Sequence, residues 1–212
     1  MDGSRTFRNL PEKMSMIHPK VMFEITDYLK REDPFRYEEW IVANSDSQWK
    51  HKTFIVDKIF EIQDSFDCVW IFAPWFGHIT IPRLLEKAEK IVVFDYDIFP
   101  VSSMLKKYGK ENVFVCERDV NFDLMLGKCN IFCFDHPPDL ILNTACEHMY
   151  YMKALGIEAF PLYALQGNNK IKSIGSEINR IDSTETLIEQ AGITEVLHAS
   201  SDEDHHTVIG YA

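Results

Sequence analysis

Three polar side chains stand at or just past the ends of short apolar runs, at Asp95, Asp119 and Asn143. A carboxylate at the end of a buried strand can accept hydrogen bonds from both hydroxyls of a ribose. An aspartate just past a strand can accept from an adenine amino group, while the next backbone N–H, here of Val120, donates to the ring. The spacing therefore predicts a crevice for a nucleoside, although each aspartate alone is equally typical of a turn or a helix cap.

Gly77 lies between the first apolar run and a segment that predicts a helix from Thr80 onward. In open α/β sheets the backbone approaches a bound nucleotide closely at such a glycine. The sequence contains neither G-x-G-x-x-G nor the G-K-[ST] of a phosphate-binding loop, which disfavours a dinucleotide clamp and a P-loop. Gly77 on its own is as consistent with a tight turn as with a binding loop.

The segment Asn143-Thr-Ala-Cys-Glu-His-Met149 follows the fourth run and places several polar groups at the predicted crevice. Glu147 or His148 could take a proton from a substrate there. A structural interpretation competes with this, because Thr144 and Glu147 have the spacing of a capping box for a helix that would end at Gly156. His148 would then pack under the preceding helix.

An amide-rich stretch containing Gln166, Asn168 and Asn169 follows the fifth apolar run. We expect it to form a loop at the same edge of the sheet. Such a loop could contact a substrate, or it could be only a turn, as Gly-Asn-Asn readily is.

The sequence predicts no metal site. Cys129 and Cys133 are three residues apart but lack a second pair of ligands. His205 and His206 are adjacent, so on a strand their side chains point to opposite faces. Neither pair reaches the quality of a zinc motif.

The elements that must position these residues alternate between apolar runs and amphipathic stretches. Continuous apolar runs suit strands buried on both faces, as in a parallel sheet covered by helices. The last two runs are separated only by Ser200–Asp204, which is too short for a crossover helix and fits a hairpin. The fold class is therefore α/β: a three-layer Rossmann-like sandwich with a mostly parallel seven-stranded sheet that ends in an antiparallel hairpin. The runs are Cys68–Phe72, Ile91–Phe94, Val113–Cys116, Leu140–Leu142, Ala159–Tyr163, Glu195–Ala199 and His206–Gly210.

Residues 1–65 predict an N-terminal helical extension that packs on the core, followed by the α/β domain over 66–212. Ile55, Ile59 and Ile62 repeat at helical spacing. The exposed side of this helix is expected to carry the charged residues Lys50, Lys52, Lys58 and Glu61.

Composition narrows the partners of the chain. It has 212 residues, a formal net charge of −11 and a pI near 5.1. Residues 175–212 hold 1 basic and 8 acidic side chains, which disfavours duplex nucleic acid as a partner. No window approaches the apolar length of a membrane helix. Five scattered cysteines are typical of reduced thiols, so we expect a cytoplasmic protein; nothing indicates its oligomeric state.

These features together resemble the class I S-adenosylmethionine-dependent methyltransferase fold over about residues 65–212. The resemblance rests on Ala73-Pro-Trp-Phe-Gly77, Asp95, Asp119, Asn143 and the terminal hairpin. More narrowly, Asn143–Met149 followed by Leu165–Asn169 resembles methyltransferase-like proteins of tailed phages, which carry a similar Asn-Thr-Ser-Cys-Glu-His segment. A viral origin would place the protein in the host cytoplasm.

The resemblance implies S-adenosylmethionine as cofactor and methyl transfer to a small-molecule or protein acceptor. It implies that the methionine part of the cofactor packs on the loop with Ala73, Trp75 and Gly77. Asp95 would hold the ribose, Asp119 and Val120 would frame the adenine, and Asn143 would line the cofactor site. The implied catalytic residues are Glu147, His148 and Asn143, and the implied substrate contacts are Gln166, Asn168 and Asn169.

Two other readings of the sequence remain open. Ala73, Pro74 and Trp75 stand where the family has an acid and two or three glycines. A catalytically degenerate protein of this fold, acting as a viral accessory or interaction module, is therefore the alternative. Another nucleotide-linked α/β enzyme is the third, and the missing glycine fingerprint counts against it.

Overall fold

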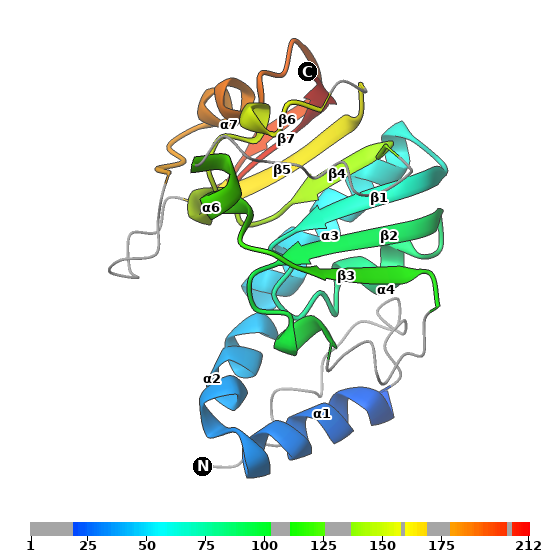
Figure 1. The fold of residues 1–212 in the computed structure, drawn as a ribbon, viewed down its shortest axis with the longest axis vertical. Helices are drawn as coiled ribbons and strands as arrows, with labels where there is room; N and C mark the ends of the chain where they lie inside the picture. Colours follow the sequence, from blue (N-terminus) through cyan, green and yellow to red (C-terminus); the bar gives the residue numbers. More distant parts are fainter. Residues whose placement is uncertain (1–18, 103–110, 126–136, 158–159, 169–178, 203–204) are drawn as a thin grey trace.

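A computed structural model describes residues 19–102, 111–125, 137–157, 160–168, 179–202 and 205–212. The described part of the chain starts with three helices, then follows a mostly alternating order of strands and helices, and ends with two consecutive strands (Figure 1). The elements are α1 (Pro19–Glu32), α2 (Pro34–Ala43), α3 (Asp46–Ile62), β1 (Phe66–Phe72), α4 (Thr80–Leu84), β2 (Ala88–Asp95), β3 (Val113–Glu117), α6 (Val120–Met125), β4 (Leu140–Asn143), the 3₁₀ helices η3 (Cys146–His148) and η4 (Met152–Leu155), β5 (Leu162–Asn168), α7 (Thr184–Ala191), β6 (Glu195–Ser201) and β7 (His205–Tyr211).

The strands form one seven-stranded sheet in the order β3-β2-β1-β4-β5-β7-β6. Strands β1 to β5 are parallel to one another, and β7 runs antiparallel to both β5 and β6. The predicted fold class is therefore confirmed, including the terminal hairpin. Because β1 to β5 are parallel, their carboxyl ends lie along one edge of the sheet.

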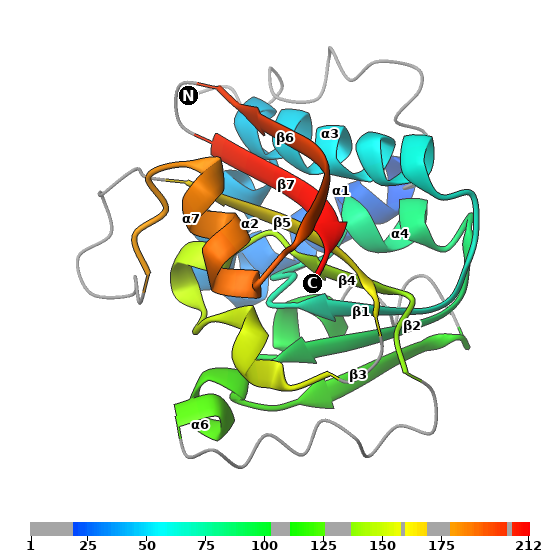
Figure 2. The ribbon, with the colours of Figure 1, turned by 90° about the horizontal axis from the view of Figure 1, so that it is seen from above.

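Helices cover both faces of the sheet, as continuous apolar strands require (Figure 2). On one face, Val69 and Ile71 of β1 pack with Ile55 and Ile59 of α3 and with residues of α4. On the other face, the alternate β1 residues, among them Trp70, pack with η4 and α7. Helix α3 thus forms part of the hydrophobic core on this sheet. The division of the chain into two domains at residue 65 stays a prediction.

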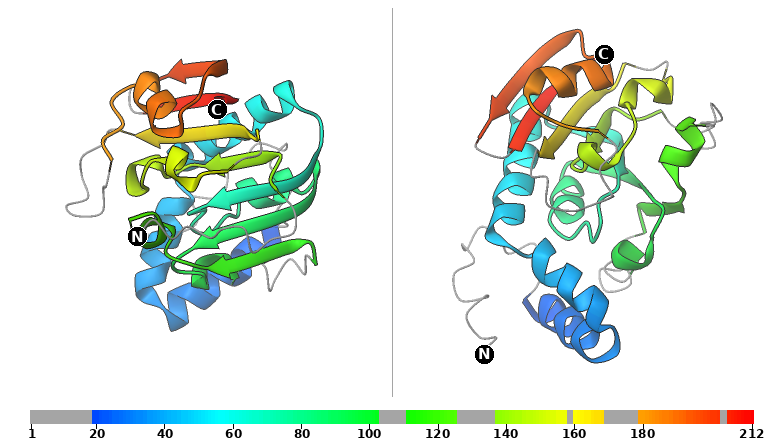
Figure 3. Two further views of the ribbon diagram at one scale, coloured as in Figure 1. Left: turned by 45° about the horizontal axis from the view of Figure 1, so that its top comes forward. Right: turned by 90° about the vertical axis from the view of Figure 1, so that its left-hand side faces the viewer.

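Helices α1 and α2 have a separate apolar cluster. Trp40 of α2 is fully buried and meets Phe76, which belongs to the loop after β1, at a ring-centroid distance of 4.9 Å. The Asp33 side chain caps α2 by accepting from the Arg36 N–H, and Pro34 occupies the first turn. Figure 3 (right) looks onto the edge where the parallel strands end, with α1 and α2 beside it.

The segment after β4 differs from the predicted capping-box helix. Two short 3₁₀ helices, η3 and η4, stand in its place, and the residue before η3 makes no side-chain cap. The Asn121 side chain explains this, because it donates to the His148 carbonyl and accepts from the Tyr150 N–H, at 2.8 Å each. These tertiary bonds outweigh the local helix signal. Gly156 does end η4, with φ +61°.

Strand β5 starts later and runs further than predicted. Gln166 and Asn168 belong to the strand and pair with Thr207 and His205 of β7, so the expected amide-rich loop was wrong for these two residues. Asn169 lies outside the described residues.

Helix α4 begins at Thr80, where the sequence predicts it, and Ile79 before it makes no side-chain cap. Helix α7 is capped by Ser183, whose side chain accepts from the Thr186 N–H. Among the described helices, none combines the length and apolar character that crossing a bilayer requires.

Candidate active site

The loop after β1 takes an unusual backbone path. Ala73, Trp75 and Gly77 have φ values of +46°, +60° and +63°. For residues with a Cβ, the left-handed region costs roughly 1–2 kcal/mol. Such outliers persist where the surroundings enforce them, and they gather at ligand-binding sites. Here the Ala73 N–H donates to the Phe94 carbonyl at 2.8 Å, which ties the loop to the end of β2.

Gly77 is required by close packing within the protein. A Cβ added to it would lie 2.4 Å from Cδ1 of Ile81 on α4. The absent side chain therefore makes room for the first turn of α4. Gly77 thus helps to seat the helix against the loop, and its predicted approach to a ligand stays a prediction.

Asp95 ends β2 beside this loop, as predicted, and is buried. Burial raises the pKa of its carboxyl to about 6, although backbone N–H groups of Asp97 and Trp75 hydrogen-bond to it and oppose the rise. The Asp97 N–H lies 3.1 Å from Oδ1. Asp95 is thus a largely desolvated acceptor at the end of a central strand.

Asp119 and Val120 follow β3 at the same edge. Asp119 is exposed, and Val120 is buried in the core beneath it. The Val120 N–H lies 3.2 Å from the Arg118 carbonyl. Arg118 forms an ion pair with Asp123 of α6 and donates its N–H to the Asp95 carbonyl at 2.8 Å. The ends of β2 and β3 are therefore joined.

Asn143 ends β4 and is fully buried. Its Oδ1 accepts from the Ala145 N–H at 2.9 Å, and its Nδ2 lies 3.3 Å from the Met152 sulfur. The side chain thereby shapes the turn into η3.

Glu147 and His148, neighbours on η3, point into different surroundings. Glu147 is buried and its Oε1 accepts from the Asn168 side chain. The His148 side chain is 40% exposed, with Nε2 3.8 Å from the same Oε1. Of the two candidate bases, Glu147 is the one that lies inside the protein.

Lys52 of α3 is the residue that the sequence analysis placed wrongly. It was expected on the exposed side of the helix, yet it is buried. Burial lowers its pKa to about 8, and the negative charge of Glu147 opposes that shift. A sequence signal for this placement exists, because Lys52 precedes Ile55 by three residues and Ile59 by seven, the spacing of one helical face.

His78 completes this buried polar group. Burial lowers its pKa well below the ordinary value, and the positive charge of Lys52 adds to the effect. Its ring packs against Trp40 and Trp49 at centroid distances of 4.8 and 5.6 Å. Nε2 is buried without a hydrogen-bond partner among the described residues. His78 is therefore a neutral imidazole close to Lys52.

Gln166 acts as a structural bridge in this arrangement. It is buried, and its Nε2 lies 3.1 Å from both the His51 carbonyl of α3 and Oγ1 of Thr207. These bonds fasten α3 to β5 and β7, so its amide is already engaged.

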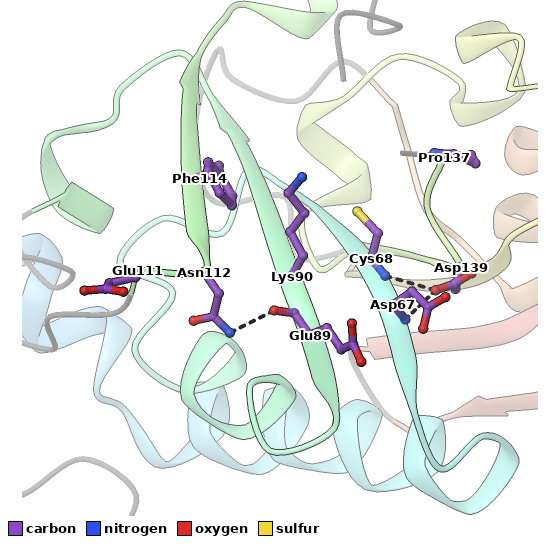
Figure 4. A pocket seen from close by; sticks show the side chains of 9 residues that line it. All are labelled: Asp67, Cys68, Glu89, Lys90, Glu111, Asn112, Phe114, Pro137 and Asp139. Carbon is purple, nitrogen blue, oxygen red and sulfur yellow. Dashed lines mark hydrogen bonds between the residues drawn. The ribbon is translucent and has the colours of Figure 1, made fainter. Parts of the chain in front are cut away.

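A pocket of about 580 Å³ lies at the opposite end of the sheet (Figure 4). It is lined where β1 and β2 begin, by Asp67, Cys68, Glu89 and Lys90 among others. Asp139 closes one side by accepting from the backbone N–H groups of Asp67 and Cys68, at 2.6 and 3.0 Å. Because α/β sheets bind ligands at the carboxyl ends of their strands, this pocket is separate from the candidate site.

No protein-family model and no curated protein sequence matches the chain. Solved structures do match it. The N-methyltransferase NodS of Bradyrhizobium japonicum WM9 aligns with 78% of this chain and 97% of its own, at 10% identity and a TM-score of 0.59. Magnesium protoporphyrin IX methyltransferase (ChlM) of Synechocystis PCC 6803, solved with bound SAH, aligns with 89% and 98%, at 10% identity and 0.57.

A third match is a SAM-dependent methyltransferase of Aquifex aeolicus, which covers 92% of this chain and 98% of its own, at 16% identity and a TM-score of 0.54. At such identities the likeness establishes the fold. The chain has the class I methyltransferase fold that its sequence resembles.

Proposed function

We propose that this protein binds S-adenosylmethionine at the carboxyl ends of β1, β2 and β3 and transfers its methyl group to a small-molecule or protein acceptor. The observation that carries the proposal is Asp95, a buried carboxylate at the end of β2 that adjoins a loop in the left-handed region. Two ribose hydroxyls would donate hydrogen bonds to this carboxylate, which burial shields from water. The shared fold supports the same placement.

The other cofactor contacts follow from the neighbouring strand ends. The loop from Ala73 to Gly77 would receive the methionine part. Asp119, exposed above the buried Val120, would accept from the adenine amino group. The Val120 N–H would have to leave its contact with the Arg118 carbonyl to donate to the ring, and at 3.2 Å across two residues that contact is weak.

The acceptor side of the site would be formed by Glu147, Lys52 and Asn168. S-adenosylmethionine supplies an already activated methyl group, so the protein has to align the acceptor and, where the acceptor is protonated, remove a proton. Glu147 would take that proton, with Asn168 holding Oε1 in place. Lys52, whose pKa is about 8, would stabilise the carboxylate or a negative group of the acceptor. The His148 side chain, which is 40% exposed, would serve at most the entrance.

The degenerate alternative has its own supporting observation. Trp75 has φ +60° in the loop that would meet the methionine part, where the family carries glycine. Its side chain is partly buried against the cluster of α1 and α2. A protein that had lost the cofactor would act as an interaction module, a role that fits the resemblance to tailed-phage proteins.

Calorimetric titration tests the proposal. Wild-type protein should bind S-adenosylmethionine and S-adenosylhomocysteine, and NAD and ATP serve as control ligands. Asp95→Ala should weaken binding by about 1–3 kcal/mol, because it removes charge-assisted hydrogen bonds. Asp67→Ala, in the pocket at the other end of the sheet, is the matched control and should bind normally. Unchanged affinity in Asp95→Ala would refute the assignment, and no binding by the wild type would favour the degenerate alternative.

A further inference from the structure

Three side chains that can ligate a metal lie together where α3 meets the β6–β7 hairpin. His51 comes from α3, Asp202 follows β6, and His205 begins β7. One ligand atom of each lies within 4.8 Å of the other two. The side chains of both histidines are 12% exposed and that of Asp202 is 39% exposed. The cluster is thus largely shielded yet reachable from solvent.

The hydrogen bonds of His51 determine which ring nitrogen faces this cluster. Nδ1 lies 2.7 Å from the Ser47 carbonyl, one turn earlier in α3. Because a carbonyl oxygen only accepts, Nδ1 carries the hydrogen. In the neutral ring, Nε2 then presents a lone pair, and it lies 2.8 Å from Oδ2 of Asp202. An ionised carboxylate also only accepts, so with this tautomer a metal ion or a second proton on His51 would satisfy both lone pairs. Ser47 Oγ, 3.3 Å from Nδ1, is the donor that the other tautomer would use.

The arrangement around His51 is the one that metal-binding histidines have. Such histidines donate their other N–H to a carbonyl or carboxylate, which fixes the tautomer and aims the lone pair at the metal. His205 stacks on His51 at a centroid distance of 3.5 Å, with Nδ1 3.9 Å from Oδ1 of Asp202. Two imidazoles and one carboxylate are thereby gathered on one side of the hairpin.

A second proton on His51 would bring two positive charges close together. Lys50 already lies 3.0 Å from Oδ2 of Asp202. An imidazolium at His51 would place a second cation on the same oxygen while stacked on His205. A metal ion would use both rings in the neutral form. The Lys50 side chain is 70% exposed, so it can turn away into solvent.

We propose that His51, Asp202 and His205 form a binding site for a divalent transition-metal ion of the zinc class. Imidazole and carboxylate ligands suit zinc, which takes four ligands and tolerates water as one of them. The ligand atoms of a zinc tetrahedron with bonds of ~2.1 Å lie roughly 3.4 Å apart. A metal ion lies in the plane of each imidazole that binds it, and the two rings are stacked at an interplanar angle of 16°. One ring therefore has to turn out of the stack before both nitrogens reach the same ion.

The ion would fasten α3 to the hairpin next to the candidate active site. His205 pairs in register with Asn168, whose side chain donates to Glu147. His51 directly precedes Lys52 in α3. The site is structural and does not depend on S-adenosylmethionine, so it can be tested whether or not the cofactor binds.

The test is calorimetric titration of metal-free protein with Zn²⁺ in the absence of S-adenosylmethionine, with Mg²⁺ as the control ion. Wild-type protein should bind Zn²⁺ at one site and unfold at a higher temperature when it is bound. His51→Gln and His205→Gln should each weaken binding by at least roughly tenfold. His198→Gln is the matched control, because His198 lies on β6 of the same hairpin but outside the cluster, and it should bind like the wild type.

Lys50→Ala separates the metal site from a simple ion pair. It removes the cation that competes for Asp202, so it should tighten Zn²⁺ binding several-fold, whereas an ion-pair network would gain nothing. Circular dichroism checks that each variant is folded. The proposal is overturned if the wild type shows no saturable Zn²⁺ binding, if both glutamine variants bind like the wild type, or if Lys50→Ala binds more weakly.

Discussion

Arg36 of α2 forms an ion pair with Asp97, which lies two residues beyond Asp95 at the end of β2. The same guanidinium pairs with Glu39 at 2.8 Å and lies 5.7 Å from the centroid of the Phe99 ring. Because the Asp97 N–H also donates to Asp95, the N-terminal helices are connected through Arg36 to the candidate ribose acceptor. Helix α2 is therefore positioned to influence binding at the proposed cofactor site.

Arg36→Ala should loosen α2 and weaken cofactor binding a few-fold. The Arg36 and Asp97 side chains are mostly buried, so the pair is worth more than an exposed one, on the order of 1 kcal/mol. Hydrogen exchange should quicken in α1 and α2 while β1 and β2 stay protected. Arg31→Ala, which removes an exposed pair on α1, is the control. Equal hydrogen-exchange rates in Arg36→Ala and Arg31→Ala would show that the Arg36 ion pair does not connect α2 to the site.

The pKa of Asp95 predicts how cofactor binding depends on pH. Burial raises this pKa to about 6, and ribose hydroxyls donate to the ionised form. Protons therefore compete with the ligand, and the Kd for S-adenosylhomocysteine should rise roughly tenfold per pH unit below 6. Asp95→Asn should bind more weakly at pH 7 and lose this dependence. A Kd that is constant from pH 7 to pH 5 in the wild type would contradict the assignment.

Lys52 predicts a rise in stability at alkaline pH. Its folded-state pKa is about 8, below the roughly 10.4 of an unfolded lysine, so between these values the unfolded chain binds the extra proton. The free energy of unfolding should therefore increase with pH, by on the order of 1–2 kcal/mol from pH 7.5 to 9.5. Urea unfolding of the wild type and of Lys52→Met measures this increase, because the variant lacks the titrating amine. If the free energy of unfolding depended on pH in the same way in both proteins, Lys52 would be solvated and the prediction would be wrong.

Two glycines distinguish backbone strain from crowding. Gly77 and Gly156 have similar φ values, +63° and +61°, but a Cβ at Gly156 meets nothing within 4 Å. Gly156→Ala should cost about 1 kcal/mol from the left-handed backbone alone. Gly77→Ala should cost more, because its Cβ also meets Ile81, and Ile81→Ala in the same chain should recover part of the difference. Equal losses of unfolding free energy in the two single variants would exclude the packing role of Gly77.

The sheet could be predicted from the sequence because its strands are apolar on both faces. Runs such as Cys68–Phe72 have no other stable place than the middle of a covered sheet. The end of β5 could not be predicted from the sequence, because Gln166 and Asn168 are polar and belong to the strand only through their pairing with β7. The helix expected after β4 failed for the same reason: Asn121, from a distant element, holds that segment in another conformation.

The candidate site was predictable only where it follows strand ends. Asp95 and Asn143 are placed by the sheet itself, so their positions follow from the apolar runs. Lys52 and the cluster of His51, Asp202 and His205 depend on how α3 packs across the sheet. His51 and Asp202 are 151 residues apart, and no local pattern in the sequence joins them.

The most direct measurement of the central claim is a crystal structure of the protein with S-adenosylhomocysteine. We expect the ribose hydroxyls on the Asp95 carboxylate, the adenine between Val120 and Asp119, and the amino acid end against the loop from Ala73 to Gly77. The ligand in the pocket lined by Asp67 and Lys90, or a site at Asp95 that stays without ligand at saturating concentration, would contradict the account.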